Sequence, residues 1–290
     1  MKTRGVFEYL LGRGATLTPH AASRLGKFDR LHAMLAVDPT AVHARGGDGQ
    51  TPLHFARSVQ IADLLLEHGA EIDARDIDHG STPAQWLGES RPLVAAHLVT
   101  RGAAPDPFLA VRIGDIPLLE RLIKAEPEGA SLRVSRDRFP AAPPAAGHIY
   151  LFTIGEGCTL LHAAVSADQS GSVRWLAANG ADVNARGGYD DGTPLHAAAW
   201  NDRAGPIGAL LDAGADINAV SGSLHHNEPI GWAIVSGAVD AFRVLRERGA
   251  AVREHHIEDA RRGAEGAFRQ FNSGRPIEAW REILRLLIKA

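Results

Sequence analysis

The chain contains short segments in which the apolar residues are spaced so that they would lie on one face of a helix. Apolar residues recur at helical spacing in IADLLLEHGA (61–70), VRWLAANGA (173–181), IGALLDAGA (207–215) and FRVLRERGA (242–250). Each segment closes on a Gly-Ala pair, and glycine readily adopts the left-handed conformation that ends many helices. The pair recurs at Gly69, Gly102, Gly180, Gly214 and Gly249, with spacings of 33, 78, 34 and 35 residues. This pattern predicts a helix that is repeated at a fixed period.

A second marker, usually Thr-Pro, precedes another apolar segment in each period. It occurs at Thr18, Thr51, Thr82, Thr159, Thr193 and Glu228-Pro229, with spacings of 33, 31, 77, 34 and 35 residues. A threonine hydroxyl can cap a helix, and proline is favoured at the first helical position because its missing N–H costs no hydrogen bond there. The two markers together predict repeated units of two helices joined by a turn.

The most regular unit reads GTPLHAAAWNDRAGPIGALLDAGADINA, residues 192–219. It resembles the ankyrin repeat, whose unit is a hairpin turn followed by two antiparallel helices and whose consensus contains T-P-L-H-x-A. The resemblance implies an all-α solenoid of helix–turn–helix units with short β-hairpin turns. We expect a single domain over 1–290 with about seven helix pairs, degenerate terminal units and a C-terminal helical cap at 257–290. One hairpin is missing after Gly102, where Asp106-Pro107 follows almost at once.

The 77-residue spacing holds one repeat and an insertion at 131–158, SLRVSRDRFPAAPPAAGHIYLFTIGEGC. PAAPPAAG favours an extended segment, and the β-branched and aromatic residues of HIYLFTI (148–154) predict a strand. Long loops in compact domains often carry function, so we interpret the insertion as an ordered finger that leans over the groove of the solenoid. The alternative is a linker that packs on its own repeat.

Composition limits the classes of partner. The chain has 31 basic and 34 acidic residues, a net charge of −3, and so lacks an overall positive field for nucleic acid or an anionic membrane. We expect neither as a partner. Cys158 is the only cysteine, which excludes an internal disulfide, and no apolar run is long enough to span a membrane. These features favour a cytoplasmic protein.

The chain contains 14 histidines, but their positions favour structure over chemistry. His54, His162 and His196 share one motif position, and the resemblance implies that this histidine forms hydrogen bonds that hold the helix start and the neighbouring turn. We therefore do not interpret these three residues as an active site.

Two further histidine pairs resemble loose groups of metal ligands. These are His225-His226, and His255-His256 with the nearby Glu258 and Asp259, but neither has a recognised ligand spacing. Cys158 has no cation beside it in the sequence that would lower its pKa, and no glycine-rich phosphate loop is present. We expect no metal, no cofactor and no catalytic residue.

Polar and aromatic residues gather on the predicted hairpins and on one helix of the repeats at 159–226. Trp200 follows His196 by four residues, so both lie on one helical stripe, which faces the concave groove in the family. We predict a non-catalytic scaffold that binds a protein partner, of unknown identity, through this groove and the hairpin tips. The predicted binding residues are Tyr189, Asp190, Asp191, Trp200, His225, His226, Tyr150 and Phe152.

A second hypothesis is a small-molecule-binding protein or enzyme with a pocket between the insertion and the groove. Its acid–base groups would be Asp190, Asp191, His225 and Tyr150, with His148 and Tyr189 beside them. No catalytic motif supports this hypothesis. A closed cavity with converging carboxylates and imidazoles would favour it, whereas an open groove would favour the scaffold.

Overall fold

The computed structural model describes residues 12–126, 128–140, 147–188, 190–222, 227–268 and 274–288, together with Val6 and Tyr9. Regular structure in these ranges is helical, apart from two isolated bridges, Arg133 with Thr159 and Gly187 with Gly192. The predicted all-α fold is confirmed. The chain divides into two compact units, residues 1–109 with 136–153 and residues 110–135 with 154–290. The single domain over 1–290 stays a prediction.

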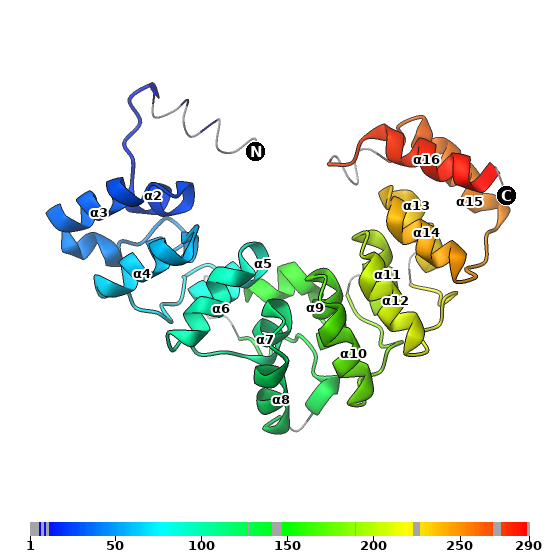
Figure 1. Ribbon diagram of the computed structural model, residues 1–290, viewed down its shortest axis with the longest axis horizontal. Coiled ribbons are helices and arrows are strands. Elements are labelled where there is room, and N and C mark those ends of the chain that lie inside the picture. The colour runs from blue at the N-terminus through cyan, green and yellow to red at the C-terminus, as the bar shows by residue number, and fades with distance from the viewer. Residues whose placement is uncertain are drawn as a thin grey trace. The chain divides into compact units, whose positions relative to one another are not determined.

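Unit 1 contains successive helix pairs (Figure 1). The pairs are α2 (Pro19–Leu25) with α3 (Phe28–Val37), η2 (Pro52–Phe55) with α4 (Val59–Glu67), and α5 (Pro83–Ser90) with α6 (Pro92–Thr100), and η1 (Pro39–His43) follows α3. Fully buried leucines are contributed by all three pairs, namely Leu31, Leu35, Leu53, Leu65, Leu87 and Leu98. Each pair therefore buries its apolar face against the next one.

Unit 2 continues the same arrangement. After α7 (Pro107–Ile113), which begins in unit 1, come α8 (Ile116–Lys124), η3 (Gly129–Ser131), α9 (Leu160–Ser166) with α10 (Ser170–Ala178), α11 (Pro194–Trp200) with α12 (Ala204–Asp212), and α13 (Pro229–Ser236) with α14 (Val239–Glu247). Counted over the described residues, seven pairs precede the C-terminal pair, as the sequence pattern predicts. None of the helices described here is long and apolar enough to cross a membrane.

The start of α11 shows how the repeated motif folds. Thr193 is the N-cap and Pro194 the first helical residue. The Thr193 N–H donates to His196 Nδ1 at 3.1 Å, and the threonine hydroxyl lies 2.9 Å from the same nitrogen. His196 Nε2 then donates to the Asn227 carbonyl of the next repeat at 2.7 Å. One histidine thus caps its own helix and fixes the following hairpin.

Arginine side chains tie successive hairpins together. In unit 2, Arg133 donates to the Arg186 carbonyl at 2.6 Å and also to a carbonyl of its own hairpin. Arg186 in turn links its hairpin to the following one by donating to the Val220 carbonyl. Val220 occupies the equivalent position, so the series ends there. Arg45 reaches the Arg75 carbonyl at 2.5 Å in unit 1 in the same way.

The C-terminal pair, α15 (Glu254–Ala264) and α16 (Ile277–Ile288), packs against α13 and α14 at the end of unit 2. Trp280 is fully buried and packs with Val235 and Phe268. A Cβ at Gly237 or Gly263 would overlap the Trp280 ring, so both positions need glycine. The helical cap that we expected from residue 257 begins at Glu254.

The prediction of a strand at 148–154 is wrong. Residues 149 and 150 are helical, and η4 (Leu151–Gly155) continues them as a wide helical turn. Ile149 and Tyr150 are both buried, whereas a strand would direct consecutive side chains to opposite faces. Packing therefore overrides the β propensity of this segment. The extended segment predicted at 140–147 lies mostly outside the described residues.

Candidate functional site

The motif histidines have the structural role predicted for them. In both His54 and His162, Nδ1 accepts from a threonine N–H and Nε2 donates to a carbonyl of the next repeat, as in His196. Burial lowers the pKa of His162 to about 4, although the hydrogen bond that Nε2 donates to the Gly192 carbonyl acts to raise it. Burial also lowers the pKa of His54 and of His196. These rings are neutral at neutral pH, and both nitrogens are already engaged.

The hairpin at 187–192 presents two of the predicted carboxylates to solvent. Gly187 and Gly192 exchange both backbone hydrogen bonds, at 3.0 and 3.1 Å. Asp190 and Asp191 are exposed, and Asp191 holds a left-handed φ of 47°. Arg186 Nη1 lies 2.9 Å from Asp191 Oδ2. Tyr189, predicted here as an aromatic anchor, lies outside the described residues.

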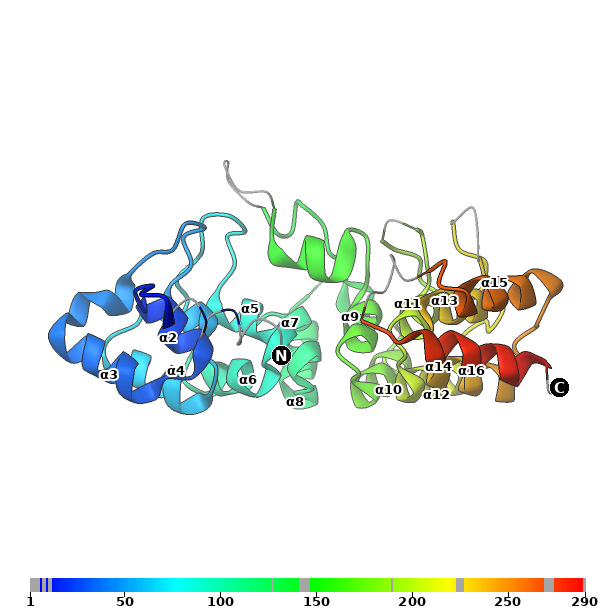
Figure 2. The ribbon, with the colours of Figure 1, turned by 90° about the horizontal axis from the view of Figure 1, so that it is seen from above.

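The next hairpin of unit 2 is joined directly to this one. The Gly222 N–H donates to the Asp190 carbonyl at 2.8 Å, and the Ser221 N–H donates to the Asn227 carbonyl at 2.8 Å. The loops that lead into α11 and α13 rise on the same side of the unit (Figure 2). Val220 is 47% exposed beside them. The predicted residues His225 and His226 lie outside the described residues.

Trp200 is half-buried and packs toward the C-terminal pair. Its ring lies 6.0 Å from that of Trp232 in an edge-to-face arrangement, and it also packs against the cluster of Val235, Phe268 and Trp280. Much of its surface is therefore used in stacking the last repeats. Trp200 was expected in the groove because it lies on the same helical stripe as His196. Its position on α11 alone could not show that residues of the C-terminal pair pack against its ring.

The aromatic residues predicted in the insertion belong to unit 1 and differ in exposure. Tyr150 is fully buried, and its hydroxyl donates to Asp106 Oδ2 at 3.0 Å. Phe152 is 59% exposed, with its ring 5.1 Å from that of His79. His79 Nδ1 in turn donates to the Gly147 carbonyl at 2.7 Å. Phe152 is thus the accessible aromatic residue of the pair.

A polar network surrounds Tyr150. Asp106 accepts from Gln85 Nε2 at 2.9 Å and from the Leu109 N–H at 3.0 Å, in addition to Tyr150. Burial raises the pKa of the Asp106 carboxyl, against the hydrogen bonds from Gln85 and Leu109 that lower it. His148 Nε2 donates to Gln85 Oε1 at 3.2 Å. Burial and the charge of Arg75 lower the pKa of His148 to about 4.

The acid–base set of the second hypothesis is divided between the two units. Tyr150 and His148 belong to unit 1, and Asp190 and Asp191 belong to unit 2. Cys158 is buried, and burial raises the pKa of its thiol to about 11.

One group of charged and titratable residues in unit 2 was not predicted from the spacing of motifs in the sequence. Glu228 is 4% exposed, and its carboxylate faces Arg253, His255 and His256. A cavity of about 730 Å³ is lined by Arg253, Glu254, His255, Ile257, Glu258 and Arg261. The available signal was that Glu228 stands where the motif has threonine and Gly231 where it has histidine.

Comparisons with known sequences identify the family of the repeats. Sequence profiles for ankyrin repeats match residues 108–221, as three copies, and residues 48–77. The chain is an ankyrin-repeat protein. The crystal structure of the human ASB11 ankyrin repeat domain is similar, with 23% sequence identity, 81% of this chain and 99% of that chain covered, and a TM-score of 0.47.

No curated protein matches the sequence. Within this ankyrin-repeat protein, the matched ranges include the three motif histidines and the hairpin at 187–192. They do not include Glu228 or the C-terminal pair, where the motif residues are replaced.

Proposed function

We propose that this ankyrin-repeat protein is a non-catalytic scaffold that binds a protein partner through the hairpin tips of unit 2 and the groove beside them. The observation that carries the proposal is the linkage of two neighbouring tips by Gly222 N–H to Asp190 O and by Arg186 to Val220 O. Asp190 and Asp191 are exposed on a backbone that is already fixed. A partner would therefore meet ordered carboxylates, which lowers the entropy cost of binding.

The chemistry of these tips favours a partner with a basic group next to an apolar one. Asp190 and Asp191 supply negative charge, and the exposed Val220 supplies apolar surface. Opposite charges in such positions select the partner and speed its association. Tyr189, Trp200, His225 and His226 remain part of the proposed surface as its aromatic and imidazole groups. Phe152 is a separate proposed contact in unit 1, where Tyr150 is buried and bonded to Asp106.

A small-molecule-binding or enzymatic role remains the second candidate, and one observation favours it. Burial raises the pKa of Asp106, which lies beside Tyr150 in a network that also contains His148, and perturbed groups of this kind gather in active sites. However, these groups hydrogen-bond to one another or to Gln85. A substrate would have to break this network before it could use any of them.

Affinity capture from a cell extract separates the two candidates. The full chain serves as bait, and the captured material is read by proteomics and by small-molecule mass spectrometry. The double variant Asp190→Asn/Asp191→Asn should lose a captured protein that Asp240→Asn, an exposed control on α14, retains. Equal capture by all three baits would contradict the proposed surface. A small molecule retained by the wild type and lost by Tyr150→Phe would favour the second candidate.

A further inference from the structure

His256 makes the same hydrogen bond through Nδ1 as the other motif histidines, but the surroundings of its Nε2 are different. Its Nδ1 accepts from the Arg253 N–H at 3.1 Å, as the Nδ1 of His196 accepts from Thr193. The Nε2 of each internal motif histidine donates to a carbonyl of the next repeat. His256 is fully buried, and its Nε2 has no hydrogen-bond partner in the structure. A buried nitrogen without such a partner needs an explanation.

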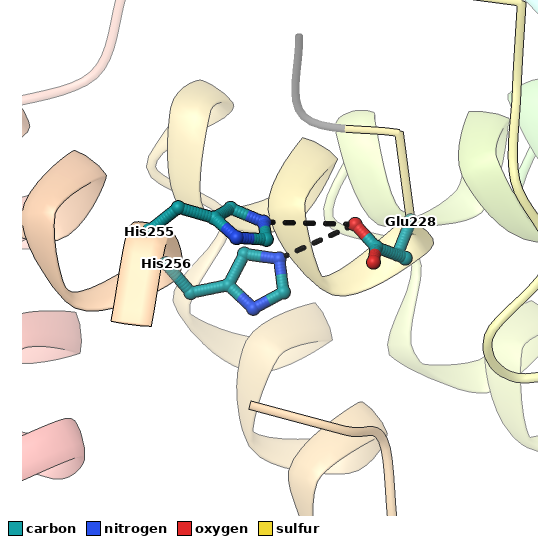
Figure 3. Close-up of side chains that lie close together, drawn as sticks. All are labelled: Glu228, His255 and His256. Carbon is teal, nitrogen blue, oxygen red and sulfur yellow. Dashed lines mark ion pairs between the residues drawn. The ribbon is translucent and has the colours of Figure 1, made fainter. Parts of the chain in front are cut away.

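The group that faces this nitrogen is the carboxylate of Glu228. Glu228 Oε2 lies 3.5 Å from His256 Nε2 and 3.8 Å from His255 Nε2, and Figure 3 shows both rings directed at the carboxylate. Arg253 binds the other carboxylate oxygen, Oε1. Glu228 is 4% exposed, so a buried acid is held between two imidazoles and one guanidinium.

We propose that Glu228, His255 and His256 form a binding site for a divalent transition-metal ion such as Zn²⁺. Their ligand atoms all lie within 4.8 Å of one another, and they form the group of this kind found among the described residues. Imidazole nitrogen and carboxylate oxygen bind zinc at about 2.0–2.2 Å, which separates tetrahedral ligands by roughly 3.3–3.6 Å. The measured separations from Glu228 need little adjustment to reach that range. An ion would also give the buried Nε2 its missing partner.

The ring proton of His256 makes this site different from a closed structural zinc site. Because Nδ1 accepts from the Arg253 N–H, the neutral ring carries its proton on Nε2. A metal can bind Nε2 of the neutral ring only in the other tautomer, so the proton moves from Nε2 to Nδ1 and the Arg253 N–H loses its acceptor. Arg253 also neutralises part of the charge of Glu228. Both effects weaken binding and favour ions with a strong preference for imidazole.

The position of His255 makes the site accessible. Its side chain is 49% exposed and lines the cavity beside Arg253 and Glu258. An ion on His255 can therefore enter from solvent, and its remaining coordination can be completed by water or by a group from a partner. The proposal replaces the sequence-based expectation of no metal, which rested on spacing alone. The carboxylate comes from Glu228, one repeat upstream of the histidine pair, rather than from Glu258 or Asp259.

The test is a Co²⁺ titration of the full chain, prepared without a purification tag and freed of metal by a chelator. Visible absorption of Co²⁺ reports nitrogen and oxygen ligands, and subsequent Zn²⁺ displaces it. We expect one equivalent to bind with a visible band. Glu228→Gln and His255→Ala should each weaken binding at least about tenfold. Neither variant alters His256, whose replacement could unfold the C-terminal pair, and circular dichroism checks their folding.

His43→Ala is the control, because His43 is exposed and belongs to unit 1. It should leave the one-equivalent binding unchanged. Equal affinity in the wild type, Glu228→Gln and His255→Ala would place the ion on other histidines and overturn the proposal. Absence of saturable binding by the wild type would overturn it as well, and Glu228 would then serve only as the ion-pair partner of Arg253.

Discussion

The regular repeats at 159–222 and the insertion at 136–153 contain the same kinds of polar residue but place them differently. In the repeats, histidine and threonine lie inside, while Asp190 and Asp191 are exposed at the hairpin tip. In the insertion, His148 and Tyr150 are buried, and Tyr150 donates to a half-buried aspartate, Asp106. The repeats thus leave acidic groups available to a partner, whereas the insertion uses its polar groups to hold itself in place.

This difference separates residues that matter for stability from those proposed for binding. Hydrogen bonds in the repeats run mostly to backbone groups, such as His162 Nε2 to Gly192 O at 3.2 Å. The insertion relies on side-chain pairs, such as Tyr150 with Asp106. Changes to buried residues in either region should therefore act on the free energy of unfolding, and changes to the exposed tips should act on binding.

The largest change in the free energy of unfolding is expected when the pH is lowered, because the buried histidines of the repeats are neutral in the folded chain. The folded-state pKa of His162 is about 4, below its usual 6.5, so its contribution is present above pH 6.5 and is lost as the pH falls toward 4. The loss for this residue should be on the order of 3 kcal/mol. Urea unfolding at pH 7.5 and at pH 4 measures it, and His162→Gln should reduce the pH dependence. An unchanged pH dependence in that variant would contradict the buried neutral imidazole.

The next effect concerns the insertion. Tyr150→Phe removes the hydroxyl that donates to Asp106, which should cost about 1–2 kcal/mol of unfolding free energy because a half-buried carboxyl loses a donor. The matched change Phe152→Leu alters an exposed ring and should cost less than about 0.5 kcal/mol. Thermal unfolding of the two variants compares them. If Phe152→Leu proved the more damaging, the assignment of the buried and exposed faces of this helical turn would be reversed.

Asp106 also gives a pH dependence of opposite sign. Because its pKa is raised in the folded chain, the contribution of Asp106 to stability is present below its unfolded pKa, about 3.9, and is lost as the pH rises through the folded value. Asp106→Asn should remove this decline while keeping the size of the side chain. The measurement is urea unfolding of the full chain at a series of pH values, for the wild type and Asp106→Asn. A wild type that gains stability over this range relative to Asp106→Asn would show that the hydrogen bonds outweigh burial.

The smallest effect is expected at the hairpin tip. Asp191→Asn keeps a residue that tolerates the left-handed conformation and removes only an exposed ion pair with Arg186. The unfolding free energy should change by less than about 0.5 kcal/mol. A larger loss in thermal unfolding would mean that Asp191 holds the hairpin together, and its exposed carboxylate could not then be assigned to binding alone.

The sequence predicted the helix pairs because their signals are local. Thr193, Pro194 and His196 specify the start of α11 within one turn, and the Gly-Ala pairs mark where the second helices end. The insertion has no such period. Its conformation depends on Asp106, which lies 44 residues before Tyr150, so β-branched and aromatic content alone gave the wrong prediction of a strand.

The candidate site residues were likewise predicted where their signal is local and missed where it depends on distant contacts. The exposed Asp190 and Asp191 were found because a hairpin tip is recognisable from its glycines. The packing of Trp200 against the cluster of Val235, Phe268 and Trp280 was missed because the contact joins distant parts of the chain. Glu228 was missed because its carboxylate meets His255 and His256 only after one repeat stacks on the next. The repeat markers already placed glutamate in the threonine position, but nothing in the sequence linked it to the two histidines.

The central claim is that the linked tips of unit 2 bind a protein partner while the buried residues only support the fold. The most direct test is the affinity of the full chain for the partner captured from extract, measured by calorimetry for the wild type, Asp190→Asn/Asp191→Asn and Tyr150→Phe. We predict that the double variant binds at least about tenfold more weakly with an unchanged melting temperature, and that Tyr150→Phe binds normally with a lower one. Normal binding by the double variant, with weakened binding by Tyr150→Phe, would contradict the claim and place the functional surface on the insertion.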